Sequence, residues 1–452
     1  MRAIDIYNNG LAKHPSNFDL AYNKARLELE LSQQPKLMSK LPLTLMQLLQ
    51  QAVASHRYAL RLEKDNVDTL FNAAQTMTDL AEEIVENAAS EEHTIQESPV
   101  VLLRDALELL DICFQRQQAL FEEQQSSPSN DTPIEEDGGV PLDVNDTPQA
   151  PPDDESDESE TFATIQHPVT PSDLLDTANA SLAALTLLVS VDEPSGLSTL
   201  ADLGDNLASK TIPRCIAQLP DNEQTAARTE AILEAASFVA ALSNSEFTSQ
   251  AIDMSTYLSR MAAFESLDLT RDFAAVCTYA DHLVELTKAV VQAFSSKVHL
   301  QHGQDAWNAA IKALSLYEAA LGFRNSPDLT ADRKASILES RGDVSLLCSR
   351  MCLTAFGLPE ALRESLAVHC EAAQIFYQSA VREYRAFGDD KAATKVEIRY
   401  LASRLCAYAY KSLPGQSRSS LLAGLQSQGP LGELVVREML EEGLYEQNVL
   451  TM

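Results

Sequence analysis

The residues best suited to chemistry in this sequence are cysteines and histidines, which occur in two close spacings. Cys348 and Cys352 stand four residues apart, about one helical turn, so their thiolates can chelate a metal ion if other ligands converge on them. Apolar neighbours on both sides favour buried helix packing instead. His299 and His302 are three residues apart at an expected helix end, and no cysteine or carboxylate can be placed beside them. We interpret them as solvated or capping residues.

Nucleophilic and acid–base chemistry lack a complete set of residues. His369 is followed by Cys370, but no third group can be assigned to orient the histidine. The adjacent carboxylates Glu82–Glu83 and Glu441–Glu442 would point in different directions on a helix, so we interpret them as solvated faces. Phosphate-binding glycine loops, nucleophile elbows and zinc-protease motifs do not occur. The sequence therefore predicts no enzymatic activity, no catalytic or metal-binding residue and no cofactor.

The elements that would carry these residues are helices. Of the 452 residues 45% are apolar, and the chain contains only 15 glycines and one tryptophan. Alanine and leucine are abundant, while strand-favouring runs of valine, isoleucine, threonine and aromatic residues are almost absent. Amphipathic periodicity places helices at about 2–14, 18–31, 49–63, 67–84, 100–123, 172–191, 196–210, 221–243, 247–265, 269–296, 303–323, 329–356, 359–387, 389–411 and 430–444. Ser172 or Asp173 is the expected N-cap of the helix at 172–191.

A small–large–small pattern recurs along these helices. It begins with Ala3, Tyr7 and Gly10, which lie on one side of a helix that Pro15 ends. The pattern returns at Ala52, His56 and Ala59, at Ala313, Tyr317 and Ala320, and at Ala373, Tyr377 and Ala380. Small residues let neighbouring helices approach closely, and the large residue fills the gap between them.

These spacings resemble the tetratricopeptide repeat, a 34-residue unit of two antiparallel helices. Ala25, Ala74 and Gly342 then fall on the small position of the unit's first helix. The resemblance implies an all-α, tetratricopeptide-like solenoid with repeat helices at 1–124, a middle helical array at 169–300, and repeat helices with a closing helix at 301–452. Residues 2–14 correspond to the second half of a unit, so either they pack as a lone edge helix or the chain extends upstream.

Charge is concentrated in one part of the chain. The net charge is −32, and the 93 residues between Arg116 and Lys210 contain no Lys or Arg but about 20 carboxylates. Within them, residues 125–168 are too polar to bury a core and are expected to form a disordered insertion, either a solvated linker or an acidic arm for a basic partner. Its densest stretch is Asp153, Asp154, Glu155, Asp157, Glu158 and Glu160. This field argues against direct binding of nucleic acid or anionic membrane.

The resemblance also implies a binding groove on the first helix of each unit. The positions that meet a ligand in this family are occupied here by Tyr22, Asn23 and Arg26, and by Phe71, Asn72 and Gln75. Both asparagines stand where an amide can pair with an extended peptide backbone. Tyr22 and Asp68 stand where members that hold acidic chaperone tails carry lysine, which argues against such a clamp.

These observations predict a non-enzymatic protein-binding scaffold. An adaptor or dedicated chaperone for a basic client, of the ribosomal-protein or histone type, accounts for the acidic charge. The alternative is a structural subunit of a larger complex. Seven widely spaced cysteines, no signal-peptide core and no uninterrupted apolar run of about 18 residues predict a cytoplasmic or nuclear protein without a membrane span.

Overall fold

The computed structural model describes residues 2–38, 41–86, 97–126, 168–293, 302–323, 326–353, 356–410 and 418–445. These residues form helices and connecting loops and include no strand, so the all-α prediction is confirmed. The main helices are α1 (Arg2–Lys13), α2 (Phe18–Ser32), α4 (Leu45–Leu62), α5 (Val67–Glu86), α6 (Pro99–Ser126), α7 (Pro171–Val191), α10 (Asp221–Thr248), α12 (Phe273–Ala293), α13 (Gly303–Leu321), α14 (Ala331–Met351), α16 (Leu366–Phe387), α17 (Asp390–Ala409) and α19 (Gly429–Glu441). Shorter helices are α3 (Pro35–Met38), α8 (Leu197–Asn206), α9 (Ile212–Ile216), α11 (Met254–Met261), α15 (Glu360–Arg363) and α18 (Arg418–Gln426).

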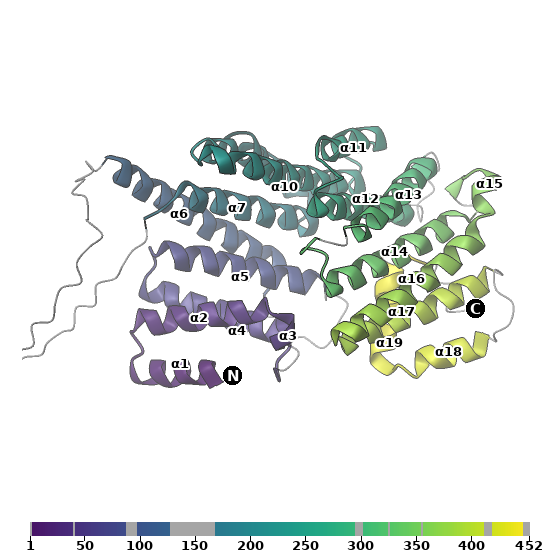
Figure 1. Ribbon diagram of the computed structural model, residues 1–452, viewed down its shortest axis with the longest axis horizontal. Helices are drawn as coiled ribbons and strands as arrows, with labels where there is room; N and C mark the ends of the chain where they lie inside the picture. Colours follow the sequence, from purple (N-terminus) through teal and green to yellow (C-terminus); the bar gives the residue numbers. More distant parts are fainter. Residues whose placement is uncertain are drawn as a thin grey trace, which may run out of the picture.

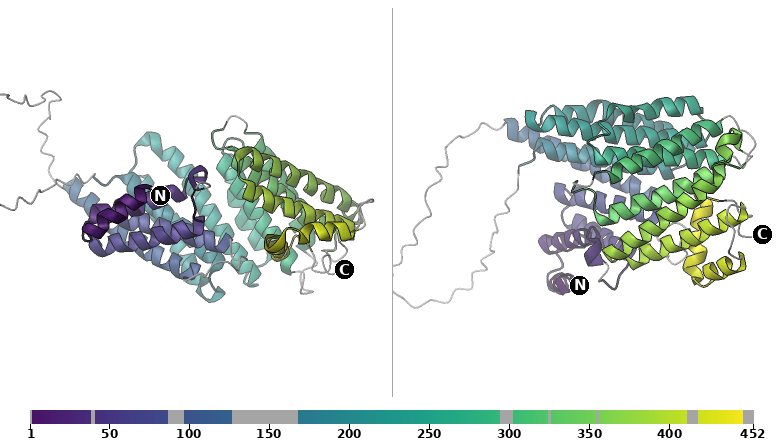
Figure 2. Two further views of the ribbon diagram at one scale, coloured as in Figure 1. Left: turned by 90° about the horizontal axis from the view of Figure 1, so that it is seen from below. Right: turned by 45° about the vertical axis from the view of Figure 1, so that its right-hand side comes forward.

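The main helices form a solenoid-like array in which each packs against the helix before it and the helix after it. Consecutive pairs are α2 with α4, α5 with α6, α7 with α10, α12 with α13, α14 with α16, and α17 with α19. In Figure 1 the array rises through α1–α7, crosses over at α10–α12 and descends through α13–α19. From below, in Figure 2, the purple and blue helices and the green and yellow helices are two stacks joined by the teal ones. We call these stacks the N-terminal arm and the C-terminal arm.

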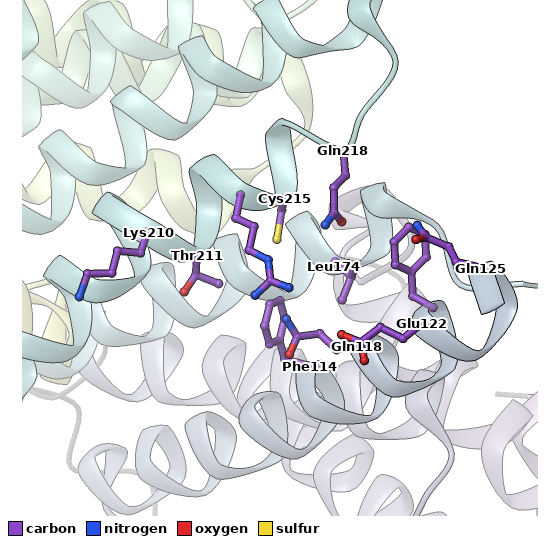
Figure 3. Close-up of a pocket in the computed structure, with 11 residues that line it drawn as sticks. Phe114, Gln118, Glu122, Gln125, Leu174, Lys210, Thr211, Cys215 and Gln218 are labelled. Atoms are coloured by element: carbon purple, nitrogen blue, oxygen red, sulfur yellow. The ribbon is translucent and has the colours of Figure 1, made fainter.

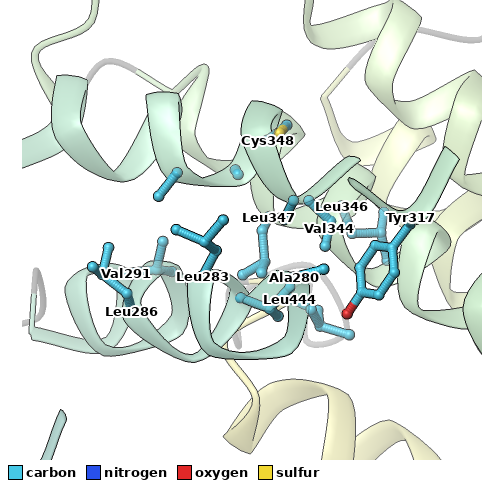
Figure 4. Packing of buried hydrophobic residues seen from close by; sticks show 14 of the residues in the cluster. Ala280, Leu283, Leu286, Val291, Tyr317, Val344, Leu346, Leu347, Cys348 and Leu444 are labelled. Carbon is cyan, nitrogen blue, oxygen red and sulfur yellow. The ribbon is translucent and has the colours of Figure 1, made fainter. Parts of the chain in front are cut away.

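Two apolar clusters fill the arms, and they meet on α10. Ala227, Phe238 and Leu242 of α10 belong to the N-terminal cluster, whereas Leu233 and Phe247 belong to the C-terminal one. One helix thus contributes its two faces to different cores, which couples the arms through a rigid element. Figure 4 shows the C-terminal cluster where α12 and α14 pack against each other.

The predicted small–large wedges are buried except for the first, in which Ala3 is exposed and Tyr7 and Gly10 are half-buried. Eight alanines of the pattern have 0% exposure: Ala25, Ala52, Ala59, Ala74, Ala313, Ala320, Ala373 and Ala380. Tyr377 is likewise fully buried. Ala3, in contrast, is exposed, because α1 packs against α2 through Ile4 and Gly10, whose backbone meets the side chain of Leu20. The pattern was therefore wrong for Ala3 as a packing residue.

Helix boundaries differ from the predictions where turn chemistry intervenes. Helix α7 begins at Pro171 with Thr170 as its N-cap, not Ser172 or Asp173. Thr170 and Asp173 form a capping box, and proline at the first helical position loses no intrahelical hydrogen bond. The helices expected at 221–243 and 247–265 are one long α10 followed by the short α11.

In place of the single helix expected at 196–210, the chain forms α8 and α9. A π-helical segment, Leu207–Thr211, joins the two. Pro213 explains this widening, because its ring cannot accommodate the carbonyl of Ser209 and offers it no N–H group. The helix expected at 359–387 is divided into α15 and α16, and α18 was not predicted.

Helix α7 is long and apolar enough to span a membrane by length and composition, although the sequence analysis expected no span. Polar residues are scattered along α7, so the helix contains no uninterrupted apolar run. In the structure α7 packs between α6 and α10, and residues such as Leu182, Leu185 and Leu188 are almost completely buried. This burial is what the core helix of an array requires.

The predicted acidic insertion lies almost entirely outside the described residues, including all six of its named carboxylates from Asp153 to Glu160. Its two flanking ends do lie together. With its side-chain amide oriented to satisfy both groups, Gln124 of α6 pairs with the backbone N–H and carbonyl of Val169 at 3.0 and 3.1 Å. The array therefore continues directly from α6 to α7.

Candidate protein-binding face

Two of the predicted groove residues meet across neighbouring repeats. The amide of Asn72 on α5 donates a hydrogen bond to the hydroxyl oxygen of Tyr22 on α2, with a nitrogen–oxygen distance of 3.1 Å. The Tyr22 ring stacks on Phe18, with centroids 5.8 Å apart. Helices α2 and α5 therefore present one joined surface, as the predicted groove requires.

The other predicted groove residues have different surroundings. Asn23 and Arg26 are exposed on α2, and Arg26 forms an ion pair with Glu30 at 2.8 Å. Gln75 is half-buried, and Phe71 packs against the N-terminal core with part of its ring accessible. The structure places all six residues on α2 and α5, while their role in binding stays a prediction.

An acidic pocket lies farther along the same helices, and the sequence analysis missed it. Four carboxylates of α5 line it, at spacings that put them on one helical face: Asp79, Glu82, Glu83 and Glu86. Leu45 and Leu49 of α4 form apolar walls, and Ser32 and Gln33 lie at the end of α2. Its volume is about 300 Å³. We call these eight residues the acidic pocket.

Burial disfavours the charged forms of carboxylates in the acidic pocket. Burial and, to a lesser extent, the neighbouring Glu82 raise the pKa of Asp79 to about 6, although a hydrogen bond with Gln33 opposes them. Burial and the neighbouring Glu86 also raise the pKa of Glu83. Interpreting Glu82–Glu83 as a solvated face was therefore wrong for Glu83, which is half-buried because α5 meets neighbouring elements there.

The C-terminal arm contributes positive charge to the same region. Lys391 and Lys395, on the first turns of α17, both act to lower the pKa of Glu83, against the stronger effect of burial. The acidic pocket therefore faces lysines from a distant part of the sequence. Only the closure of the array brings these charges near one another, so no local pattern could have revealed them.

A second cavity, of about 420 Å³, lies between α6, α7 and the π-helical segment. Figure 3 shows Phe114, Leu174 and Cys215 at its apolar base, with Lys210 and several glutamines around its rim. The cavity has no cluster of groups suited to catalysis. The cavity adjoins the π-helical segment that Pro213 induces, since Lys210 belongs to that segment.

Cys348, Cys352 and His369, three of the residues considered for chemistry, are packed into the array. Cys348 is fully buried, and burial raises its pKa well above the usual range of a thiol. Cys352 points its sulfur at the carbonyl of Leu362, 3.3 Å away. His369 packs edge-on against Trp307, and burial lowers its pKa. His299 lies outside the described residues, among which no group of three or more potential metal ligands occurs.

Comparisons with known proteins do not assign a family. No protein-family model matches the sequence, and no curated protein matches it. Among solved structures, the chain is similar to a "circular tandem repeat protein with novel repeat topology and enhanced subunit contact surfaces". That likeness covers 99% of this chain and 88% of the other, with 14% identity and a TM-score of 0.28. At such a TM-score it supports no inference about this chain.

Proposed function

We propose that the protein is a non-enzymatic adaptor or dedicated chaperone whose N-terminal arm holds a basic segment of a partner protein. Helical repeat arrays generally serve protein–protein interaction, and the surface joined by Tyr22 and Asn72 offers such an array's contact face. The observation that carries the proposal is the acidic pocket beside that face.

The acidic pocket suits a lysine or arginine side chain of a partner. The aliphatic stem of such a side chain would lie against Leu45 and Leu49, while its charge would reach the carboxylates of α5. A bound cation would also favour the charged form of Asp79 and so oppose the effect of burial on its pKa. The pocket gains from an incoming positive charge, because burial raises the pKa of Asp79, Glu83 and Glu86 even with Lys391 and Lys395 nearby.

The rest of the chain supports a basic client. The net charge of −32 would draw a Lys- and Arg-rich protein towards the array over long distances. We propose a client of the ribosomal-protein or histone type, with the acidic segment 125–168 as a second contact. Seven free cysteines fit a reducing compartment, and we propose the cytoplasm or nucleus.

The test measures binding of a fluorescent Lys- and Arg-rich peptide to the full chain at about 50 and 300 mM salt. The test variant combines Asp79→Asn, Glu82→Gln and Glu86→Gln. Because each ion pair contributes roughly 0.5–1 kcal/mol, we expect about tenfold weaker binding. A matched variant with Asp202→Asn, Asp205→Asn and Glu223→Gln removes the same charge from exposed sites on α8 and α10. It should change affinity by less than about twofold.

The two variants distinguish binding at the acidic pocket from attraction by the net charge of the chain. Equal weakening by both would show that the peptide senses only net charge, and would remove the acidic pocket as a binding site. Neutralising the six carboxylates between Asp153 and Glu160 tests the acidic segment on its own. Binding that survives this change but fails in the pocket variant would reduce the segment to a linker.

A structural subunit of a larger complex is the second candidate. Val368 and Ile375 stand seven residues apart on α16 and are 64% and 61% exposed. Two such residues on one helical face favour a permanent protein contact. A complex that survives high salt but is lost on Val368→Ser with Ile375→Ser would support this role over the first.

A further inference from the structure

The last residues of α19 and the chain beyond it lie against the helices of the C-terminal arm. We call residues 441–445 the C-terminal strap. Figure 4 shows Leu444 among the buried apolar side chains that α12 and α14 contribute to the C-terminal cluster. Leu444 and Tyr445 are each 1% exposed, although the strap is not part of a helix pair.

A glycine turns the chain into this position. Gly443 has a φ of +75°, and its N–H and that of Leu444 donate hydrogen bonds to the carbonyls of Leu440 and Met439. This is the glycine-ended helix terminus that satisfies the last carbonyls of α19. A Cβ on Gly443 would lie 3.1 Å from the guanidinium group of Arg350 and 3.4 Å from Val291. The strap backbone therefore lies flush against α12 and α14.

Side chains of the arm bind the strap through its backbone. The amide of Gln292 on α12 donates to the carbonyl oxygen of Glu441 at 2.7 Å, and Arg350 on α14 donates to the carbonyl of Gly443. Carbonyls at a helix end lack intrahelical partners, so these donors supply them. Recognition of main-chain carbonyls by donors from two helices is how a groove holds a peptide.

One side chain of the strap is recognised by charge. Glu442 accepts two hydrogen bonds from the guanidinium group of Arg399 on α17, at 2.9 and 3.2 Å. Burial alone would raise the pKa of Glu442, but Arg399 and Lys288 outweigh it and keep that pKa below its usual range. The interpretation of Glu441–Glu442 as a solvated face was therefore wrong for Glu442.

The groove around the strap contains both signs of charge. Lys288 comes from α12 with Glu285 as its partner, Glu339, Asp343 and Arg350 come from α14, and Lys395 and Arg399 come from α17. Besides Glu442 of the strap, Arg399 pairs with Glu339 and Asp343 of α14. The groove therefore contains carboxylates of its own that balance part of its positive charge.

We propose that α12, α14 and α17 form a peptide-binding groove that the C-terminal strap occupies as a resident ligand. Its external ligand is a partner segment of the same chemistry: a carboxylate, a residue without a bulky side chain, then an aliphatic and an aromatic residue. Such a segment displaces the strap and docks on Arg399, Gln292 and Arg350. This site selects an acidic–aromatic segment, so it is independent of the proposed site for a basic partner.

The test uses a fluorescent peptide of residues 437–445, REMLEEGLY, with the full-length chain. In Gly443→Val the new side chain is strained at positive φ and meets Arg350, so the strap is released. The peptide should bind this variant about tenfold more tightly than the wild-type chain, in which the strap competes. Gly388→Val introduces the same strain where no atom of the described part of the chain lies within 4 Å of a Cβ, and should bind as the wild type does.

Further variants make the outcome decisive. A peptide with Glu442→Arg and Tyr445→Ser should not bind, and adding Arg350→Ala and Gln292→Ala to Gly443→Val should abolish binding of the original peptide. If the Gly443→Val variant loses its helical circular dichroism, the Glu442→Gln variant is used in its place, because that change weakens the strap's contact with Arg399 more mildly. Equal peptide affinity in the wild-type and released chains, or none in either, would overturn the proposal.

Discussion

The aromatic ring of Tyr377 on α16 lies directly against the backbone of Gly342 on α14. A Cβ atom on Gly342 would come within 2.5 Å of a ring carbon, so only glycine leaves room for the ring. The Tyr377 hydroxyl group reaches past the glycine and donates a hydrogen bond to Asp343 at 2.6 Å. Helices α14 and α16 therefore meet through a wedge that fills space and also orders a buried carboxylate.

Replacing this glycine should destabilise the C-terminal arm. Gly342→Ala gains about 1 kcal/mol of helix propensity but forces the ring of Tyr377 to move, at a cost of about 1–3 kcal/mol. We expect a net loss of about 1 kcal/mol, measured by urea unfolding. Gly424→Ala on α18 is the control, because among the described residues its Cβ would meet only Leu401, at 3.9 Å. That change should stabilise slightly, and a loss as large as that of Gly342→Ala would contradict the wedge.

Much of this packing could be predicted from the sequence, because it depends on local spacing. Tyr377 was assigned to a wedge from the recurrence of small and large residues, and Gly342 to a small position through the resemblance to the tetratricopeptide repeat. A second wedge was missed, where Gly204 of α8 meets the ring of Phe238, since a Cβ there would lie 2.1 Å from the ring. The segment around Gly204 follows no repeat spacing, so only the folded chain reveals the pair.

The candidate sites were harder to predict, because their residues come from separated helices. The pattern identified Tyr22 and Asn72 individually but not the hydrogen bond between them. Glu83 and Glu442 each have an acidic neighbour in sequence, which made them resemble solvated residues. Their burial depends on elements far along the chain, and sequence periodicity holds no information about such closures.

Arg399 should be the most sensitive residue of the C-terminal arm. It is 8% exposed and lies within 3.3 Å of oxygen atoms of Glu339, Asp343 and Glu442. Arg399→Met leaves these buried carboxylates without their cation, and we expect a loss of about 3–5 kcal/mol in urea unfolding at pH 8. Because protonation removes the repulsion, the loss should shrink at about pH 5. A loss that does not depend on pH would point to packing instead.

The link between α2 and α5 should contribute modestly to stability. Asn72→Ala and Tyr22→Phe each remove one partner of their hydrogen bond, and we expect about 0.5–1.5 kcal/mol for either change. The double variant should lose less than the sum of the two, because only one bond is broken. Full additivity in thermal unfolding would show that the two side chains do not interact.

His56 should make the N-terminal arm sensitive to acid. It is fully buried on α4, where no group of the described residues forms a hydrogen bond with either ring nitrogen, and burial lowers its pKa to about 4. Between about pH 6.5 and pH 4 the unfolded state therefore binds a proton that the folded state excludes. Stability should fall as the pH falls through this range, by up to about 3 kcal/mol from this residue.

The variant His56→Leu isolates this effect, since other groups also titrate. Leucine has a similar volume and needs no hydrogen bond, so the variant should be at least as stable at pH 7.5. Its advantage over the wild type should grow on acidification towards about pH 4. Parallel unfolding curves for the two proteins between these pH values would mean that His56 is solvated.

Asp79 should affect stability and binding in opposite directions. Its pKa of about 6 in the folded chain exceeds that of an unfolded aspartate, so the folded state binds the extra proton between about pH 4 and 6. Wild-type stability is therefore lost as the pH rises through this window. Asp79→Asn removes that loss, and we expect about 1–2 kcal/mol of stabilisation at pH 7.5 and almost none at pH 4.

The same change should weaken binding of a Lys- and Arg-rich peptide, because an amide cannot pair with a cation as a carboxylate does. A neutralising change that raises stability but lowers affinity is what we expect for a residue retained for binding at a cost in stability. Asp202→Asn on the exposed side of α8 should alter neither property. If Asp79→Asn stabilises the chain but leaves peptide affinity intact at low salt, Asp79 is a strained structural residue and the acidic pocket binds its partner without it.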